Sequence, residues 1–106
     1  MKIIKNNIIP FKGFLAINLF GVLFVRKENE HKLTEEIINH ECIHTEQMKE
    51  LLYIFFYLIY LVEWIIRLLF TMNFHKTYRS ISFEKEAYAH MKELDYLNKR
   101  KHFAMW

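Results

Sequence analysis

TEEIINHECIHTEQMKELL, residues 34–52, is the segment from which a helical fold is most clearly predicted. Thr34 is a favourable N-cap residue, and the acidic Glu35 and Glu36 that follow it suit the positive end of a helix dipole. Neither glycine nor proline interrupts the segment, so we predict one continuous helix. All the glycine and proline of the chain lies within its first 21 residues, so the rest should be helical.

A second, very apolar helix is predicted next, over residues 54–72. Apart from Glu63 and Arg67, residues 51–70 carry no charge, and these two lie four positions apart, where a helix lets them pair. Two interpretations are open. A segment of about 20 apolar residues matches a bilayer crossing, which predicts membrane association through residues 51–72. A small helical protein also needs one helix that is buried nearly all round.

A third helix is predicted over residues 82–99, after a polar loop from Met72 to Ile81. Ser80 or Ser82 can provide its N-cap. The residues that recur at helical spacing and form its buried face are Phe83, Ala87, Met91 and Leu94. The basic residues 99–101 end the helix, and we expect them in solvent.

The N-terminal part of the chain has a different composition. Residues 11–26 are rich in aromatic and β-branched types and have Asn18 and Gly21 near their middle, which predicts a β-hairpin or two short strands. Residues 27–32 are polar and predict a loop. The sequence therefore predicts a mainly α fold, with three helices and a short N-terminal hairpin, in a single domain over residues 1–106.

Composition argues against several classes of protein. A net charge of +3 is too weak to indicate nucleic-acid binding. A single cysteine, Cys42, cannot form an internal disulfide, and no small-residue cleavage site follows the first 25 residues. We therefore expect a cytoplasmic or membrane-associated protein that is not secreted.

The chemistry of the chain is concentrated in the segment His40-Glu41-Cys42-Ile43-His44. Side chains four residues apart lie on one face of a helix, so the two imidazoles can bind one Zn²⁺ ion. Glu41 is placed to act as a general base without binding the metal. Such a spacing arises by chance in a chain of this composition with a probability of roughly 0.03. Cys42 should point away from the metal and pack against its neighbours.

A catalytic zinc site needs a third protein ligand. Glu84 is our first candidate, because it opens the third helix at the edge of that helix's buried face. Glu63 is the alternative, since it would meet His44 across a helical hairpin if the chain reverses near residues 53–55. An ion pair with Arg67 would explain Glu63 without any metal, so we predict Glu84.

Taken together with Phe83-Glu84-Lys85-Glu86-Ala87-Tyr88, the His-Glu-x-x-His segment resembles the zinc metallopeptidases of the gluzincin group, in particular the membrane-embedded CAAX-type and heat-shock peptidases. The chain also resembles, over most of its length, small uncharacterised bacterial proteins with the same order of elements. These resemblances imply a zincin-like minimal fold and Glu84 as the third ligand. Tyr88 stands where those peptidases carry an aspartate, so the carboxylate that would orient a ligand is absent or supplied elsewhere.

The predicted function is hydrolysis of peptide bonds in a peptide or protein substrate, with Glu41 as the general base beside a zinc-activated water. The hairpin would offer an edge strand to an extended substrate. The residues available to stabilise an oxyanion or to orient a ligand are Tyr78, Arg79, Tyr88 and His90. The alternatives are a non-catalytic domain stabilised by zinc and a small membrane protein in which the motif is fortuitous.

Overall fold

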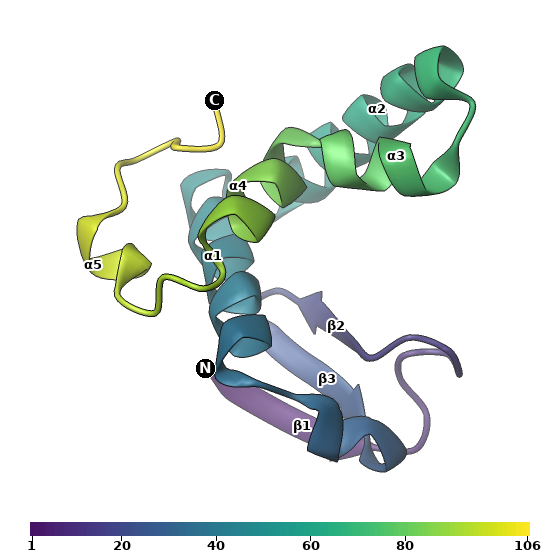
Figure 1. Cartoon of the computed structure of the whole chain (residues 1–106), viewed down its shortest axis with the longest axis vertical. Helices are drawn as coiled ribbons and strands as arrows, with labels where there is room; N and C mark the ends of the chain where they lie inside the picture. Colours follow the sequence, from purple (N-terminus) through teal and green to yellow (C-terminus); the bar gives the residue numbers. More distant parts are fainter.

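The computed structural model describes residues 1–106 and shows a mainly helical chain with a small sheet formed by its N-terminal part (Figure 1). The strands are β1 (Lys2–Asn6), β2 (Ala16–Leu19) and β3 (Val22–Arg26). The helices are α1 (Glu35–Glu50), α2 (Ile54–Thr71), α3 (Phe74–Ser80), α4 (Ser82–His90) and α5 (Tyr96–Lys99), with a 3-10 helix at Lys27–Lys32 before α1. The predicted fold class is observed at this level, with more helices than the three expected.

The sheet has β3 in its middle, parallel to β1 and antiparallel to β2, so β2 is an edge strand. The hairpin predicted over residues 11–26 corresponds to β2 and β3 and is shorter than expected. Its turn residues Phe20 and Gly21 have φ angles of 52° and 89°, as tight two-residue hairpin turns require. Strand β1 was not predicted, because it pairs with β3 across an intervening segment and no local turn marks that pairing.

Helix α1 begins where the sequence predicts. The hydroxyl of Thr34 accepts a hydrogen bond from the Ile37 backbone N–H at 3.2 Å, which satisfies one of the free donors at the helix start. The helix ends at Glu50, two residues before the predicted end. It therefore holds the whole His-Glu-x-x-His segment in its interior, with five helical residues before His40.

The loop predicted from Met72 to Ile81 is wrong, because most of it forms α3. The side chain of Asn73 accepts a hydrogen bond from the Lys76 backbone N–H at 3.0 Å and so caps this helix. Met72 has a φ angle of 52° and lies in the left-handed region, which ends α2 and turns the chain back. The polar composition thus marks two helix ends rather than a long loop.

The single helix predicted over residues 82–99 is also wrong, since it divides into α4 and α5 after His90. The reason lies on α1. The side-chain amide of Asn39 donates to the backbone carbonyl oxygens of His90, Met91 and Glu93 at 2.9–3.2 Å. These contacts satisfy carbonyls that a continuing helix would have used and hold the chain in a turn.

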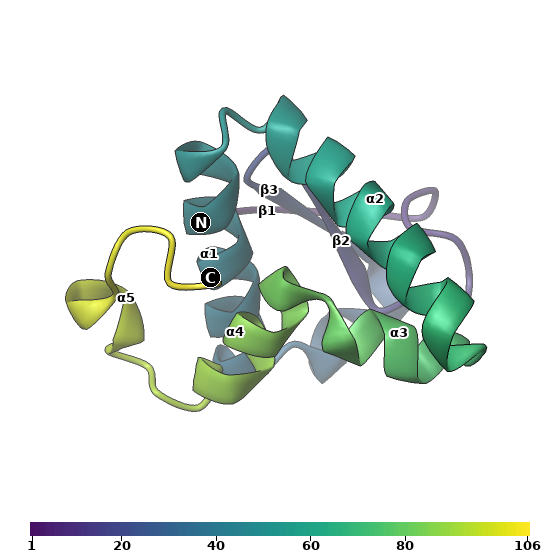
Figure 2. The same ribbon diagram turned by 90° about the horizontal axis from the view of Figure 1, so that it is seen from above.

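Helix α2 is not the buried core helix that one interpretation predicted. Only Phe56 of its 18 residues is buried. Its two charged residues do pair, with Arg67 Nε at 3.2 Å from Glu63 Oε1. By length and composition the helix could cross a membrane, with a mean hydropathy of 1.9. It lies on the outside of the molecule (Figure 2), so its apolar character is not explained by the protein core.

The core lies among α1, α2 and α4. Its larger cluster consists of Met48, Phe56, Ile81, Phe83 and Met105. A smaller cluster, Ile43, Ala87 and Tyr96, joins α1 to α4 and α5. The sheet lies at one end of the molecule and α2, α3 and α4 at the other, with α1 between them (Figure 1). The same face of α1 that packs on α4 carries both histidines of the motif.

Candidate metal centre

Three buried side chains from α1 and α4 converge on one point. His40 and His44 lie one turn apart on α1, with their Nε2 atoms 3.1 Å from each other. Glu84 lies in the first turn of α4, and its Oε1 is 3.2 Å from His40 Nε2 and 2.9 Å from His44 Nε2. The packing of Ile43 on Ala87 holds the two helices together beside this cluster. The structure thus brings together the three residues that the sequence singled out.

The three atoms fit a tetrahedral metal ion. Ligands of a tetrahedral zinc, each about 2.0–2.1 Å from the metal, lie about 3.3 Å from one another. The observed triangle has sides of 2.9, 3.1 and 3.2 Å. Two imidazole nitrogens and one carboxylate oxygen form a donor set that is typical of catalytic zinc sites. The residues present therefore fit zinc without any rearrangement of the two helices.

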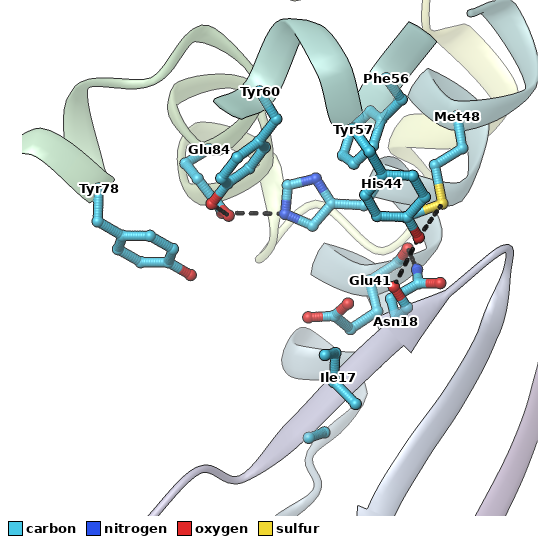
Figure 3. A pocket seen from close by; sticks show the side chains of 11 residues that line it. Ile17, Asn18, Glu41, His44, Met48, Phe56, Tyr57, Tyr60, Tyr78 and Glu84 are labelled. Carbon is cyan, nitrogen blue, oxygen red and sulfur yellow. Dashed lines mark hydrogen bonds and ion pairs between the residues drawn. The ribbon is translucent and has the colours of Figure 1, made fainter. Parts of the chain in front are cut away.

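The second oxygen of Glu84 is held by Tyr60 on α2. The phenol hydroxyl of Tyr60 donates a hydrogen bond to Glu84 Oε2 at 2.7 Å, and Figure 3 shows this ring above the carboxylate. The bond fixes the orientation of the carboxylate and leaves Oε1 facing the histidines. Tyr60 was not among the predicted site residues, although a phenol on so apolar a helix is itself a sign that its hydroxyl has a buried partner.

Charges in the cluster stabilise each other. Burial disfavours the imidazolium form of His44, but the Glu84 carboxylate outweighs it and raises the pKa of His44 to about 9. Burial raises the pKa of Glu84, whereas its polar neighbours lower it. The contacts from His44, His40 and Tyr60 prevail and hold the pKa of Glu84 well below its usual range. Glu84 is therefore ionised at neutral pH, and the cluster favours a positive charge at its centre.

Glu41 lies beside the cluster without joining it. Burial raises the pKa of its carboxyl, against the opposing effects of the two histidines and of a hydrogen bond from the Asn18 side chain. Glu41 faces a cavity of about 270 Å³ that also reaches His44 and Glu84 (Figure 3). The residues that line this cavity are Ala16, Ile17, Asn18, Glu41, His44, Met48, Phe56, Tyr57, Tyr60, Tyr78 and Glu84. The site is therefore open on the side where Glu41 lies.

The other predicted site residues divide into two groups. Tyr78 lines the cavity, and Tyr88 packs its ring on His40 and donates from its hydroxyl to that of Tyr78 at 3.3 Å. Arg79 instead stacks its guanidinium on the ring of Tyr88, with its Cζ atom 3.7 Å from the ring centroid. His90 lies at the end of α4, stacked on a ring of α5. Tyr78 and Tyr88 thus belong to the site, whereas Arg79 and His90 do not reach it.

Glu63, the alternative third ligand, is used elsewhere. Its carboxylate accepts hydrogen bonds from the backbone N–H of Ser82 at 2.8 Å and from the Ser82 hydroxyl at 2.7 Å, besides its contact with Arg67. It therefore caps the start of α4 in place of the serine that the sequence predicted. Glu63 does not contact His40 or His44, and it acts on the site only by fixing the helix that carries Glu84.

No protein family, curated protein or solved structure matches the chain. The function must therefore be inferred from the geometry of the site.

The edge strand β2 is fixed against the motif helix by two residues that sequence analysis did not select as site residues. Asn18 donates from its side-chain amide to the Glu41 backbone carbonyl at 3.0 Å and to the Thr45 hydroxyl at 3.1 Å. Tyr57 donates to the Asn18 carbonyl at 3.1 Å and accepts from the Phe20 N–H at 3.0 Å. A polar residue inside an apolar strand is the signal that would have identified Asn18.

Proposed function

We propose that the chain is a zinc-dependent metallopeptidase that hydrolyses peptide bonds with Glu41 as general base. The observation that carries this proposal is the carboxylate of Glu41, which lines a cavity beside His44 and Glu84 without belonging to the cluster of ligating atoms. Structural zinc sites are closed by four protein ligands. Only three ligating side chains gather here, and the open side holds a base instead of a fourth ligand.

Each residue of the site has a separate role in the proposed hydrolysis. His40, His44 and Glu84 would hold the zinc, which supplies an activated water and polarises the peptide carbonyl. Glu41 accepts a proton from the attacking water and returns it to the leaving amine, and its raised pKa favours the second transfer. Tyr78 can donate a hydrogen bond to the developing oxyanion, because burial raises the pKa of its phenol and keeps it protonated.

The substrate expected is an extended peptide. Ala16, Ile17 and Asn18 of the edge strand β2 line the cavity, and an edge strand binds an extended chain through backbone hydrogen bonds. A larger apolar cavity of about 810 Å³ adjoins it and shares Ala16, Ile17 and Tyr78. This arrangement favours peptides with a large apolar side chain near the bond that is cut.

The test of this proposal is cleavage by the zinc-loaded protein. Incubated with a mixture of short unstructured peptides, it should produce new peptide ends that mass spectrometry identifies. Cleavage should cease with a chelator and return with added zinc. Stoichiometric zinc without cleavage of any peptide would instead support the non-catalytic, zinc-stabilised alternative.

We also propose that the outer face of α2 lies against a lipid bilayer. The exposed residues of this face are Ile54, Phe55, Leu58, Leu61, Val62, Ile65, Ile66, Leu69 and Phe70. None of them can form a side-chain hydrogen bond, whereas a protein interface contains about one hydrogen bond per 100–200 Å². The two charged residues of the helix, Glu63 and Arg67, pair with each other, Glu63 also accepts from Ser82 of α4, and neither is among the exposed residues of this face. Lipid tails suit such a surface better than another protein does.

Leu58→Glu should weaken binding of the protein to vesicles of phosphatidylcholine and phosphatidylglycerol by roughly 10-fold, because burying one leucine contributes about 1.5–3 kcal/mol. Co-sedimentation measures this affinity. Leu94→Glu is the matched control, since Leu94 is 55% exposed against 53% for Leu58 and lies beyond α4. Equal binding by the two variants, or no binding by the unaltered protein, would remove the bilayer proposal.

A further inference from the structure

We propose that Gln47 positions His44 for metal binding, and that a buried chain of polar contacts from Gln47 to Arg100 fixes Gln47 in turn. The inference rests on the zinc site proposed above and assigns the group that orients one of its ligands. The resemblance to gluzincins left this group open, because Tyr88 occupies the position of the expected aspartate.

The orientation of the Gln47 amide follows from its partners. Its nitrogen, Nε2, lies 3.0 Å from the Phe83 carbonyl oxygen and 3.0 Å from Glu86 Oε1. Both partners are acceptors, so the atom that faces them must be the NH₂ group. The amide oxygen then faces His44 Nδ1 at 2.8 Å. Because this oxygen can only accept, Nδ1 must carry a proton.

This hydrogen bond determines which nitrogen of His44 is available to a metal. With the proton on Nδ1, the neutral imidazole has its lone pair on Nε2, the atom that faces Glu84 Oε1 at 2.9 Å and His40 Nε2 at 3.1 Å. Gln47 therefore fixes both the tautomer and the rotation of the ring. Outer partners of this kind orient ligating histidines in metal sites generally.

Gln47 is itself held by a network that reaches the C-terminal segment. Arg100 donates from Nη2 to Glu86 Oε1 at 3.0 Å and to Glu50 Oε1 at 2.9 Å. Tyr96 donates to Glu86 Oε2 at 2.7 Å. The side chain of Arg100 is only 5% exposed, so the prediction that the basic residues 99–101 lie in solvent is wrong for this one. Glu86 is buried within the network.

The network explains why a neutral amide can orient the ligand. Gln47 is fully buried, and its NH₂ group needs an acceptor that stays in place. The Glu86 carboxylate provides it, and Arg100 compensates the charge of that carboxylate. Loss of the Gln47 side-chain amide removes the acceptor of His44 Nδ1–H, while the rest of the ion-pair network keeps its contacts.

Gln47→Leu should weaken zinc binding by roughly 10–100-fold, the usual cost of removing an outer partner of a metal ligand. Competition with a chelating dye measures the affinity. Asn39→Leu is the control for a purely structural effect, because it removes another buried side-chain amide of α1, one that contacts only the backbone carbonyls of His90, Met91 and Glu93. It should lower the melting temperature and leave zinc affinity unchanged. Equal loss of affinity in both variants would overturn the inference.

One further measurement keeps the inference testable if Gln47→Leu does not fold. In the ¹⁵N-labelled zinc-loaded protein, the imidazole spectrum of His44 should show a protonated Nδ1 and a metal-bound Nε2, and the reverse assignment would overturn the inference. If the unaltered protein binds no zinc, the proposed function fails as well. If it binds zinc and Gln47→Leu binds equally, only the role of Gln47 fails.

Discussion

Glu41→Gln is expected to lower the rate of peptide hydrolysis by about 100-fold or more while zinc binding stays intact. Glutamine has the shape of glutamate but cannot accept a proton, and general-base catalysis contributes about 10²–10⁴-fold to such reactions. The substitution should not disturb the fold, since glutamine keeps the size of the side chain and its amide oxygen can still accept a hydrogen bond from Asn18. Cleavage rate and zinc content, measured on the same preparation, test both parts of this expectation.

Glu46→Gln provides the matched control for the catalytic effect. Glu46 lies on the same helix with its side chain 41% exposed and contacts only Lys49. The same chemical change there should leave both activity and zinc content unaltered. Loss of zinc from Glu41→Gln would mean that Glu41 is a ligand, and full activity in this variant would mean that the base is another residue.

Glu84→Ala is expected to weaken zinc binding by more than the roughly 10–100-fold that loss of an outer partner costs, because it removes one of three ligands. His40→Ala and His44→Ala should behave alike. The two histidines alone would still face each other, with no carboxylate to neutralise the charge of the ion. Metal titration gives the affinity, and circular dichroism shows whether the helices remain.

Glu63→Ala separates a ligand from a helix cap. This substitution leaves the start of α4 without its acceptor and Arg67 without its partner. Removal of a helix cap costs about 0.5–2 kcal/mol of stability. Zinc affinity should remain close to that of the unaltered protein once the variant is folded. Should Glu63→Ala be folded without zinc, and Glu84→Ala retain it, the assignment of the third ligand would be wrong.

The candidate site was more predictable from the sequence than the fold around it. The spacing of His40 and His44 fixes their geometry as soon as the segment is helical, and Thr34 with its acidic neighbours made that helix a secure prediction. Glu84 followed from its place at the start of a helix with one apolar face. These inferences need only local periodicity, which a single sequence contains.

Contacts between distant segments were the part that the sequence could not reveal. The end of α4 depends on Asn39, which lies more than 50 residues earlier and holds the turn after His90. The cap of α4 comes from Glu63 rather than from a neighbouring serine. Gln47 had no distinguishing pattern at all, since its role exists only where Glu86 and His44 meet it in space.

A crystal structure of the protein grown with zinc tests the central claim most directly. We expect the metal to be bound by Nε2 of His40, Nε2 of His44 and one carboxylate oxygen of Glu84, with a water molecule as the fourth ligand on the side of Glu41. A fourth protein side chain on the metal would contradict a catalytic site. Zinc bound elsewhere, with these three side chains left as they are, would contradict the account as a whole.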